Sequence, residues 1–165
     1  MKYILILTLA ISSLWACSDS SQKKDTKETE AAPVATTPIN NNDTIVIKAM
    51  GANMNEIRYD IKTLKVPADK EITIALVNES TDASMPHNIV FIEQGTATDV
   101  GNAGYKFPDN GFVDASDKNV IASSPLVQIN ETAYFSFTTP SAGDYEFICS
   151  YPGHWGRMKG KFIAE

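Results

Sequence analysis

Residues 125–149 read PLVQINETAYFSFTTPSAGDYEFIC, and this stretch decides the class of fold. Within it, Ala133, Phe135 and Phe137 alternate with polar residues, as do Tyr145, Phe147 and Cys149. Apolar residues at every second position share one face of a β-strand, so the stretch predicts two strands, each with one buried face. The segment TPSAGD between them carries the proline and glycine at which a strand ladder stops.

Similar runs fill most of the chain on either side: TIVIKAM, TLKVPADKEITIALVNES, HNIVFIEQG and MKGKFIAE. Short alternating segments bounded by turn residues predict an all-β fold, a sandwich of antiparallel strands. Residues 95–125 break the pattern for about thirty residues. We interpret them as a flap inserted between strands, with a short helix over 97–103.

The N-terminal 42 residues have a different character. Residues 1–16, MKYILILTLAISSLWA, place a lysine before a short apolar run, which predicts an export signal. The ending LWAC resembles the lipobox of bacterial lipoproteins, and lipidation of Cys17 is favoured over an ordinary signal peptide that leaves an unpaired thiol outside the cytosol. Residues 17–42 have almost no large apolar side chains, which predicts a flexible tether, followed by one folded domain at 43–165.

The net charge of the folded part limits which classes of molecule it can bind. Residues 43–165 hold 10 Lys and Arg against 16 Asp and Glu, so this segment carries the net charge of −6 almost alone. Such a balance disfavours nucleic acid and favours basic proteins as partners.

The candidate site lies in CSYPGHWGRM, residues 149–158, which contain Cys149, His154 and Met158. The other histidine of the chain, His87, occurs in SMPHNIVF at the start of a predicted strand. One thiolate, two imidazoles and one thioether are the ligands of a blue-copper electron-transfer site, in which two histidines and a cysteine bind in a plane and methionine binds weakly on the axis.

Other interpretations of these residues stay open. Cys149 and His154 could form a nucleophile and its base, although no orienting partner is evident. Zinc could accept the same donors, but a structural zinc site normally uses four strong ligands. Taken singly, Cys149 and Met158 suit a hydrophobic core and His154 a surface loop.

Beyond the ligands, YEFICSYPGHWGRMKGKF closely resembles the copper-binding loop of azurin and the auracyanins in the cupredoxin family, and SMPHNIVF resembles the segment with the first histidine. The resemblance covers nearly all of residues 43–165 and implies a Greek-key β-sandwich that binds one copper ion. It assigns the in-plane positions to His87, Cys149 and His154, and the axial position to Met158. The lipobox adds that the protein is a bacterial lipoprotein.

The resemblance also implies roles for neighbouring residues. Asn88 would tie the two ligand-bearing segments together, with its backbone N–H near the sulfur. Pro86 replaces the glycine of azurin, and its carbonyl could act as a further weak axial ligand. His154 would present its edge at the surface as the electron exit. An apolar docking patch would surround it, formed by Met85, Pro86, Tyr151, Pro152 and Trp155.

These features together predict an electron carrier. It would shuttle single electrons between membrane-associated or periplasmic redox proteins, such as cytochromes or respiratory complexes, as a monomer lipid-anchored in the cell envelope. The alternative is a copper carrier or buffer without a redox role. A copper enzyme would need a second copper bound by further histidines, and both histidines of the chain are already used, so no enzymatic activity is expected.

Overall fold

The computed structural model describes residues 44–82 and 84–165. The predicted signal peptide (1–16), Cys17 and the tether (17–42) lie outside the described residues. The elements of the described part are β1 (Thr44–Met50), β2 (Arg58–Tyr59), β3 (Thr63–Val66), β4 (Glu71–Asn78), β5 (Val90–Glu93), α1 (Ala97–Gly104), the 3₁₀ turn η1 (Pro108–Asn110), β6 (Val120–Ser123), β7 (Thr132–Thr138), β8 (Gly143–Ile148) and β9 (Lys159–Ala164).

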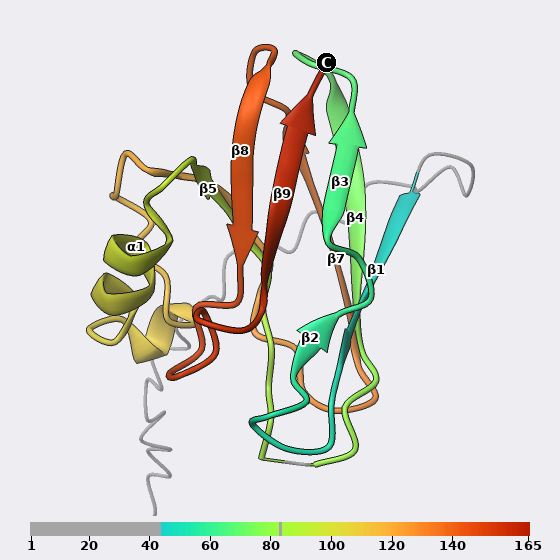
Figure 1. The fold of residues 1–165 in the computed structure, drawn as a ribbon, viewed down its shortest axis with the longest axis vertical. Helices are drawn as coiled ribbons and strands as arrows, with labels where there is room; N and C mark the ends of the chain where they lie inside the picture. Colours follow the sequence, from blue (N-terminus) through green and yellow to red (C-terminus); the bar gives the residue numbers. More distant parts are fainter. Residues whose placement is uncertain (1–43, 83) are drawn as a thin grey trace, which may run out of the picture. The chain divides into compact units, whose positions relative to one another are not determined.

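The strands of the described residues form two sheets that face each other, so the predicted β-sandwich is confirmed (Figure 1). One sheet has the order β2-β1-β4-β7, and the other has the order β3-β9-β8-β5-β6. The alternation in TAYFSFT appears directly as the exposure pattern of β7, in which Ala133, Phe135 and Phe137 turn inward.

Two strand pairs differ from the expected antiparallel arrangement. β1 runs parallel to β4, and β3 runs parallel to β9. A parallel pair requires a connection that crosses over rather than a tight turn. Here the chain leaves the first sheet after β2, forms β3 in the opposite sheet, and returns as β4 beside β1. The period-two pattern is the same for both strand directions, so it could not reveal this.

Aromatic side chains from both sheets fill the interior. Phe91 of β5 lies at the centre, with ring centroids 4.9 Å from Phe137 of β7 and 4.8 Å from Phe162 of β9. Phe147 of β8 lies 6.2 Å away on the same side of the sandwich. Because large aromatic rings dominate burial energetics, this cluster joins the sheets into one core.

The flap covers the outer side of β5 and β8. The short helix predicted over 97–103 is confirmed as α1, and it packs beside these strands (Figure 1). A second buried cluster forms there from Val90, Ile92, Val100, Val113 and Ile148. β5 is therefore buried on both faces, which explains its continuous apolar run VFI. The flap also contains β6, an edge strand that the aperiodic sequence did not predict.

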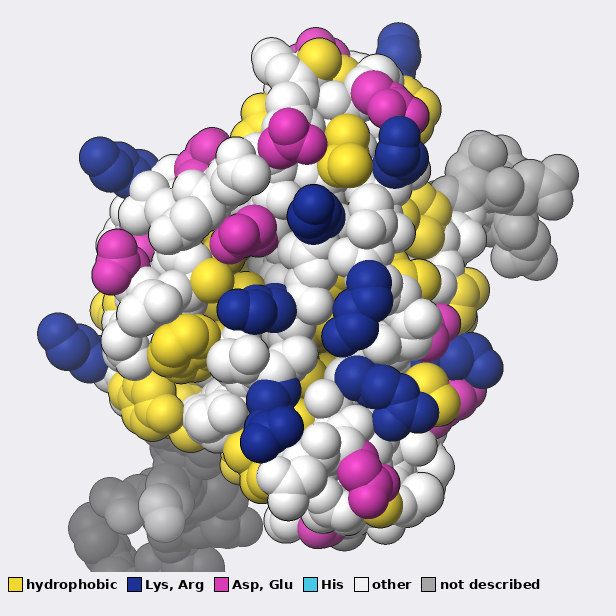
Figure 2. All heavy atoms as spheres, viewed as in Figure 1, with side chains coloured by type: hydrophobic (Ala, Val, Ile, Leu, Met, Phe, Trp, Pro, Cys, Tyr) yellow, Lys and Arg dark blue, Asp and Glu magenta, His cyan; other side chains and the backbone are white. Residues whose placement is uncertain are grey.

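The charges are unevenly distributed over the domain. Figure 2 shows Lys and Arg side chains gathered over the sheet that contains β3 and β9. Lys65, Lys159 and Lys161 are exposed on these strands, whereas the neighbouring residues Leu64 and Phe162 point inward. Among the described residues, no helix has the length and apolar character needed to cross a membrane.

Candidate metal centre

The segment CSYPGHWGRM forms the whole loop between β8 and β9. Cys149 directly follows β8, and Met158 directly precedes β9. The last residue of β8, Ile148, pairs with Lys159, the first residue of β9. Across the loop entrance, the Cys149 N–H donates to the Met158 carbonyl at 2.9 Å. The strand pair thereby closes the loop at its base and fixes the backbone of both residues.

His87 reaches the same end of the sandwich from a distant part of the sequence. It lies just before β5, and its backbone exchanges two hydrogen bonds with Val127, of 3.0 and 2.7 Å. β5 runs antiparallel to β8, with Val90 opposite Ile148. Residues that precede β5 therefore lie beside residues that follow β8, which brings His87 next to Cys149.

The donor atoms of three side chains converge. The Cys149 Sγ lies 3.8 Å from the His87 Nδ1 and 3.6 Å from the His154 Nδ1, and the two Nδ1 atoms are 3.2 Å apart. All three residues are buried. A first-row metal such as zinc binds imidazole nitrogen at about 2.0–2.1 Å and thiolate sulfur at about 2.3 Å, so one ion would hold such donors roughly 3–4 Å apart. The observed spacing fits a single ion.

The environment keeps the two imidazoles neutral, as metal ligands must be. Burial lowers the pKa of both histidines from 6.5 to about 4, and the neighbouring His154 contributes to the shift at His87. Both rings therefore offer a lone pair at neutral pH. The uncharged imidazoles and one sulfur form a donor set with the softness that copper prefers.

Burial shifts the pKa of Cys149 upward, whereas it shifts the pKa values of the two histidines downward. Burial raises the pKa of its thiol to about 11, although hydrogen bonds from the backbone N–H groups of Asn88 and Tyr151 oppose the rise. Without a metal the group is a buried thiol. A bound cation would replace its proton, and the two N–H groups would then stabilise the thiolate.

Asn88 joins three segments of the site. Its side-chain NH₂ donates to the Ser150 Oγ and to the Gly111 carbonyl, each at 2.8 Å, and its Oδ1 accepts the Ser150 N–H at 2.9 Å. Tyr59 adds a hydrogen bond from its hydroxyl to the Asn88 carbonyl. The first histidine segment, the ligand loop and the flap are thus connected through one buried amide.

Met158 and Pro86 are both buried at this end of the domain. Met158 is held in the loop by its N–H, which donates to the His154 carbonyl at 2.9 Å. The structure therefore brings all four residues of the predicted ligand set into one region. The backbone contacts place Met158 beside Cys149.

The expected surface position of His154 is wrong for this structure. Its side chain is only 1% exposed. The ring of Tyr151 lies against it with a centroid distance of 4.8 Å, and Phe112 from the flap meets Tyr151 edge-on at 5.1 Å. Sequence patterns could not reveal this cover, because Phe112 lies about forty residues away in the chain.

The predicted docking patch also changes in composition. Met85 is only 6% exposed and belongs to the main core, whereas Tyr151 and Pro152 remain half-buried at the surface. Met54, which the sequence did not single out, is 42% exposed. Its methyl group lies beside Gly153, where an added Cβ would meet it at 3.3 Å. The loop surface is therefore bordered by a methionine from the β1–β2 connection.

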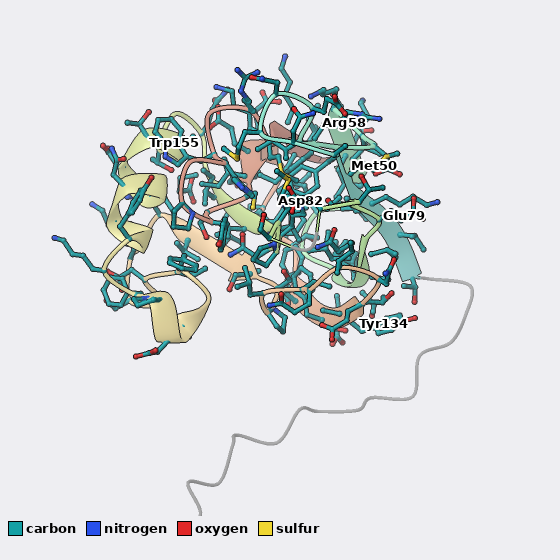
Figure 3. All side chains as sticks on the ribbon, turned by 90° about the horizontal axis from the view of Figure 1, so that it is seen from below. Met50, Arg58, Glu79, Asp82, Tyr134 and Trp155 are labelled. Atoms are coloured by element: carbon teal, nitrogen blue, oxygen red, sulfur yellow. The ribbon has the colours of Figure 1, made fainter. Side chains whose placement is uncertain are left out.

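Trp155 packs sideways onto the flap instead of joining the patch. Figure 3 views the domain from the loop end, with Trp155 on the side of α1. At Gly101 of α1, an added Cβ would lie 2.5 Å from the indole ring, so glycine permits the close approach. Tyr105, just after the helix, accepts a hydrogen bond from the Gly153 N–H at 3.0 Å. Two contacts thus fasten the ligand loop to the flap.

Comparison with known proteins gives a consistent set of relatives. Residues 46–165 match the family described as copper binding proteins of the plastocyanin/azurin family. Auracyanin-A of Chloroflexus aurantiacus is 37% identical over 118 residues, which cover 70% of this chain and 72% of that protein. Azurin of Alcaligenes faecalis is 33% identical over 113 residues, covering 64% of this chain and 88% of that protein. Outer membrane protein H.8 of Neisseria gonorrhoeae is 31% identical over 112 residues, covering 65% and 61%.

The solved structures give the same result. Auracyanin A, described as a blue copper protein from a green thermophilic photosynthetic bacterium, superimposes with a TM-score of 0.66 and 35% identity. The superposition covers 74% of this chain and 98% of that chain. The superposition leaves about a quarter of this chain unmatched. Residues 1–43, which precede the described domain, are a segment of about that length.

Proposed function

We propose that this chain, which belongs to the plastocyanin/azurin family of copper binding proteins, is a one-electron carrier. The observation that carries the proposal is the convergence of His87, Cys149 and His154, whose donor atoms lie 3.2–3.8 Å apart in a buried site. When bound there, copper supplies a centre that alternates between Cu(I) and Cu(II).

The protein contributes rigidity to this activity. Cys149 and Met158 are fixed by the β8–β9 pair, and His87 is fixed by its backbone hydrogen bonds to Val127. Side chains held by secondary structure keep their positions when the charge at the site changes. A site that moves little on oxidation and reduction transfers electrons with a low barrier.

Met158 and Pro86 complete the proposed coordination. Met158 would supply a weak thioether ligand, because the loop holds it next to Cys149 in the buried site. The carbonyl of Pro86, which directly precedes His87, would add a further weak ligand. Asn88 supports the segments that carry His87 and Cys149 through its hydrogen bonds to Ser150.

The surface of the β8–β9 loop is the proposed route for electrons. His154 lies beneath Tyr151, so electrons would pass through the ring of Tyr151 instead of through an open imidazole edge. Met54 extends this surface. A small apolar area with a buried redox site suits brief docking to another redox protein.

The partners and location follow from the sequence in front of the domain. The predicted signal peptide and Cys17 support a lipid anchor in the cell envelope, and one relative is named as an outer membrane protein. A domain tethered in this way would exchange electrons with membrane-associated or periplasmic redox proteins such as cytochromes or respiratory complexes. The use of both histidines in one site argues against enzymatic turnover, and the excess of Asp and Glu over Lys and Arg argues against a nucleic-acid partner.

A spectroscopic titration tests the proposal. One equivalent of Cu(II) is added to the protein, followed by ascorbate, with visible and EPR spectra recorded at each step. The expected result is an intense blue thiolate-to-copper band with narrow copper hyperfine splitting that bleaches on reduction. Cys149→Ser is the matched control, because it keeps the two imidazoles and removes the sulfur, so its blue band should be absent.

Two other outcomes would overturn the proposal that the protein is an electron carrier. Stoichiometric copper binding with a pale tetragonal spectrum would favour a copper carrier or buffer, and no stoichiometric binding would reject both. The burial of all three donors argues against rapid metal release to another protein. The electron carrier is therefore the function that the geometry supports best.

A further inference from the structure

The imidazole of His87 has a second buried partner that the ligand pattern did not indicate. Its Nε2 lies 2.8 Å from the Oγ of Ser80. Ser80 is 2% exposed and His87 is fully buried. The opposite ring nitrogen, Nδ1, is the one that approaches Cys149 and His154. Ser80 therefore contacts the ring on the side away from the metal site.

Ser80 is itself held in place by a buried amide. Its backbone N–H donates to the Asn78 Oδ1 at 3.0 Å. The Asn78 NH₂ donates to the carbonyls of Met85 and Val127, each at 3.0 Å. Val127 also accepts the N–H of His87 at 3.0 Å. Serine and histidine are thus fixed to the same small network at the end of β4.

The chemistry of imidazole gives this contact a consequence. A histidine that binds a metal through Nδ1 must carry its hydrogen on Nε2. The Ser80 oxygen lies where it can accept that hydrogen. A partner at the outer nitrogen fixes the tautomer and the ring orientation and strengthens electron donation to the metal. A hydroxyl can also donate, so it can hold the ring before any metal arrives.

We propose that Ser80 is a positioning residue of the copper site, whose hydroxyl fixes the tautomer and orientation in which the Nδ1 of His87 binds the metal. This inference rests on the proposed function and adds a residue seven positions upstream of the ligand. It also implies a direction for the reduction potential. Stronger donation from the ring stabilises Cu(II) more than Cu(I), so Ser80 lowers the potential.

Two variants and a matched control test the role. Ser80→Ala removes the hydroxyl, and Ser80→Thr keeps it. Thr139→Val is the control, because Thr139 is also 2% exposed and donates its hydroxyl hydrogen to the Pro67 carbonyl, but at the end of the sandwich where β7 stops. Each protein is loaded with copper, and its copper affinity, EPR spectrum and reduction potential are measured.

The expected losses are specific to Ser80→Ala. Removal of an outer partner of a ligating histidine typically weakens metal binding about 10–100-fold. Each tenfold greater loss for Cu(II) than for Cu(I) raises the potential by about 59 mV for one electron. Ser80→Thr should stay close to the unmodified protein, and Thr139→Val should lose stability without a change in potential. An unchanged potential and affinity in Ser80→Ala would overturn the proposal.

A second measurement needs no variant, so it decides the question even if Ser80→Ala does not fold. In the diamagnetic Cu(I) protein, NMR should detect a slowly exchanging hydrogen on the Nε2 of His87, with a nuclear Overhauser effect to the β-protons of Ser80. A rapidly exchanging hydrogen without that contact would overturn the inference. Failure of the proposed function looks different, because the unmodified protein would then lack the blue spectrum altogether.

Discussion

At the scale of single residues, Asn88 has the most connections in the site. Its side-chain amide makes two hydrogen bonds with Ser150 and one with Gly111, and both hydrogen bonds with Ser150 are buried. A buried polar group that loses its partner costs about 1–3 kcal/mol. The site therefore depends on one side chain that need not touch the metal.

Asn88→Ala should lower the free energy of unfolding by about 1–3 kcal/mol for each group left without a partner. It should also broaden the blue band, because the ligand loop and the histidine segment are no longer tied together. Urea denaturation with and without copper measures the first effect. Asn55→Ala is the control, since Asn55 is exposed and accepts only a surface hydrogen bond from Arg157. Equal losses in both variants would contradict the role of Asn88.

The two histidines predict how the metal-free protein responds to acid. Burial lowers the pKa of each from 6.5 to about 4. Between these values the unfolded chain binds more protons than the folded domain, so the free energy of unfolding falls as the pH is lowered from 6.5 to 4. Urea midpoints at several pH values in this window should decrease, and a constant midpoint would show that the rings are not shielded.

The buried thiol of Cys149 predicts how the stability of the metal-free protein changes at alkaline pH. Burial raises the pKa of its thiol from 9.0 to about 11, so the folded domain keeps a proton that the unfolded chain releases. Stability of the metal-free protein should therefore fall as the pH rises from 9 to 11. Cys149→Ser should remove most of the loss between pH 9 and 10 and leave the response to acid unchanged. Above pH 10 the loss should remain, because burial also raises the pKa of Tyr59 well above its usual value. A loss between pH 9 and 10 that persists in that variant would assign the effect to another group.

At the scale of elements, the flap and the ligand loop act on each other. α1 packs on the outer face of β5 and β8, and Trp155 of the loop rests on Gly101 of the helix. The flap is therefore part of the wall of the site and not only an insertion. Its sequence has no period because its residues pack against a sheet face and a loop at once.

Gly101→Ala tests this contact. Alanine normally favours a helix, but here its Cβ would lie 2.5 Å from the indole of Trp155 and force the ring to move. Overpacking of this kind costs about 1–3 kcal/mol, and we also expect a changed EPR spectrum because Trp155 follows His154. The control is Gly156→Ala in the same loop, where the added Cβ meets open space. The helix contact is unimportant if both variants match the unmodified protein in urea.

At the scale of the whole molecule, the two ends of the sandwich have different roles. The ligand loop occupies one end, and the β7–β8 connection occupies the other. The described domain carries a net negative charge, although one sheet face gathers lysines (Figure 2). Charge added at one end should therefore affect electron exchange only if that end makes the contact.

The rate of electron self-exchange between Cu(I) and Cu(II) molecules shows which end of the domain makes the contact. Pro152→Glu adds a negative charge at the loop surface and should slow self-exchange several-fold at low ionic strength, because two such surfaces must meet. Ala142→Glu adds the same charge at the exposed opposite end and should have little effect. NMR line broadening gives both rates. An equal slowing in both variants would argue against exchange through the loop.

Much of the site was predictable from the residues, because chemistry limits the choice of ligands. A chain with two histidines and one cysteine in its folded part has few ways to build a soft metal site, and CSYPGHWGRM already held three of the four candidates. The alternation in TAYFSFT likewise determined which face of β7 is buried, since side chains of a strand point alternately to its two sides. The breakdown of that alternation after Gly95 marked the flap and its helix.

The tertiary structure alone decided the remaining features. The parallel pairing of β1 with β4 and β3 with β9 leaves no mark on a period-two pattern. The contacts of Ser80 with His87 and of Trp155 with Gly101 depend on which segments the two sheets bring to one end. The cover over His154 has the same origin, because Tyr151 is itself supported from the flap. Local sequence determines donors and faces, whereas distant segments that pack together determine burial, orientation and access.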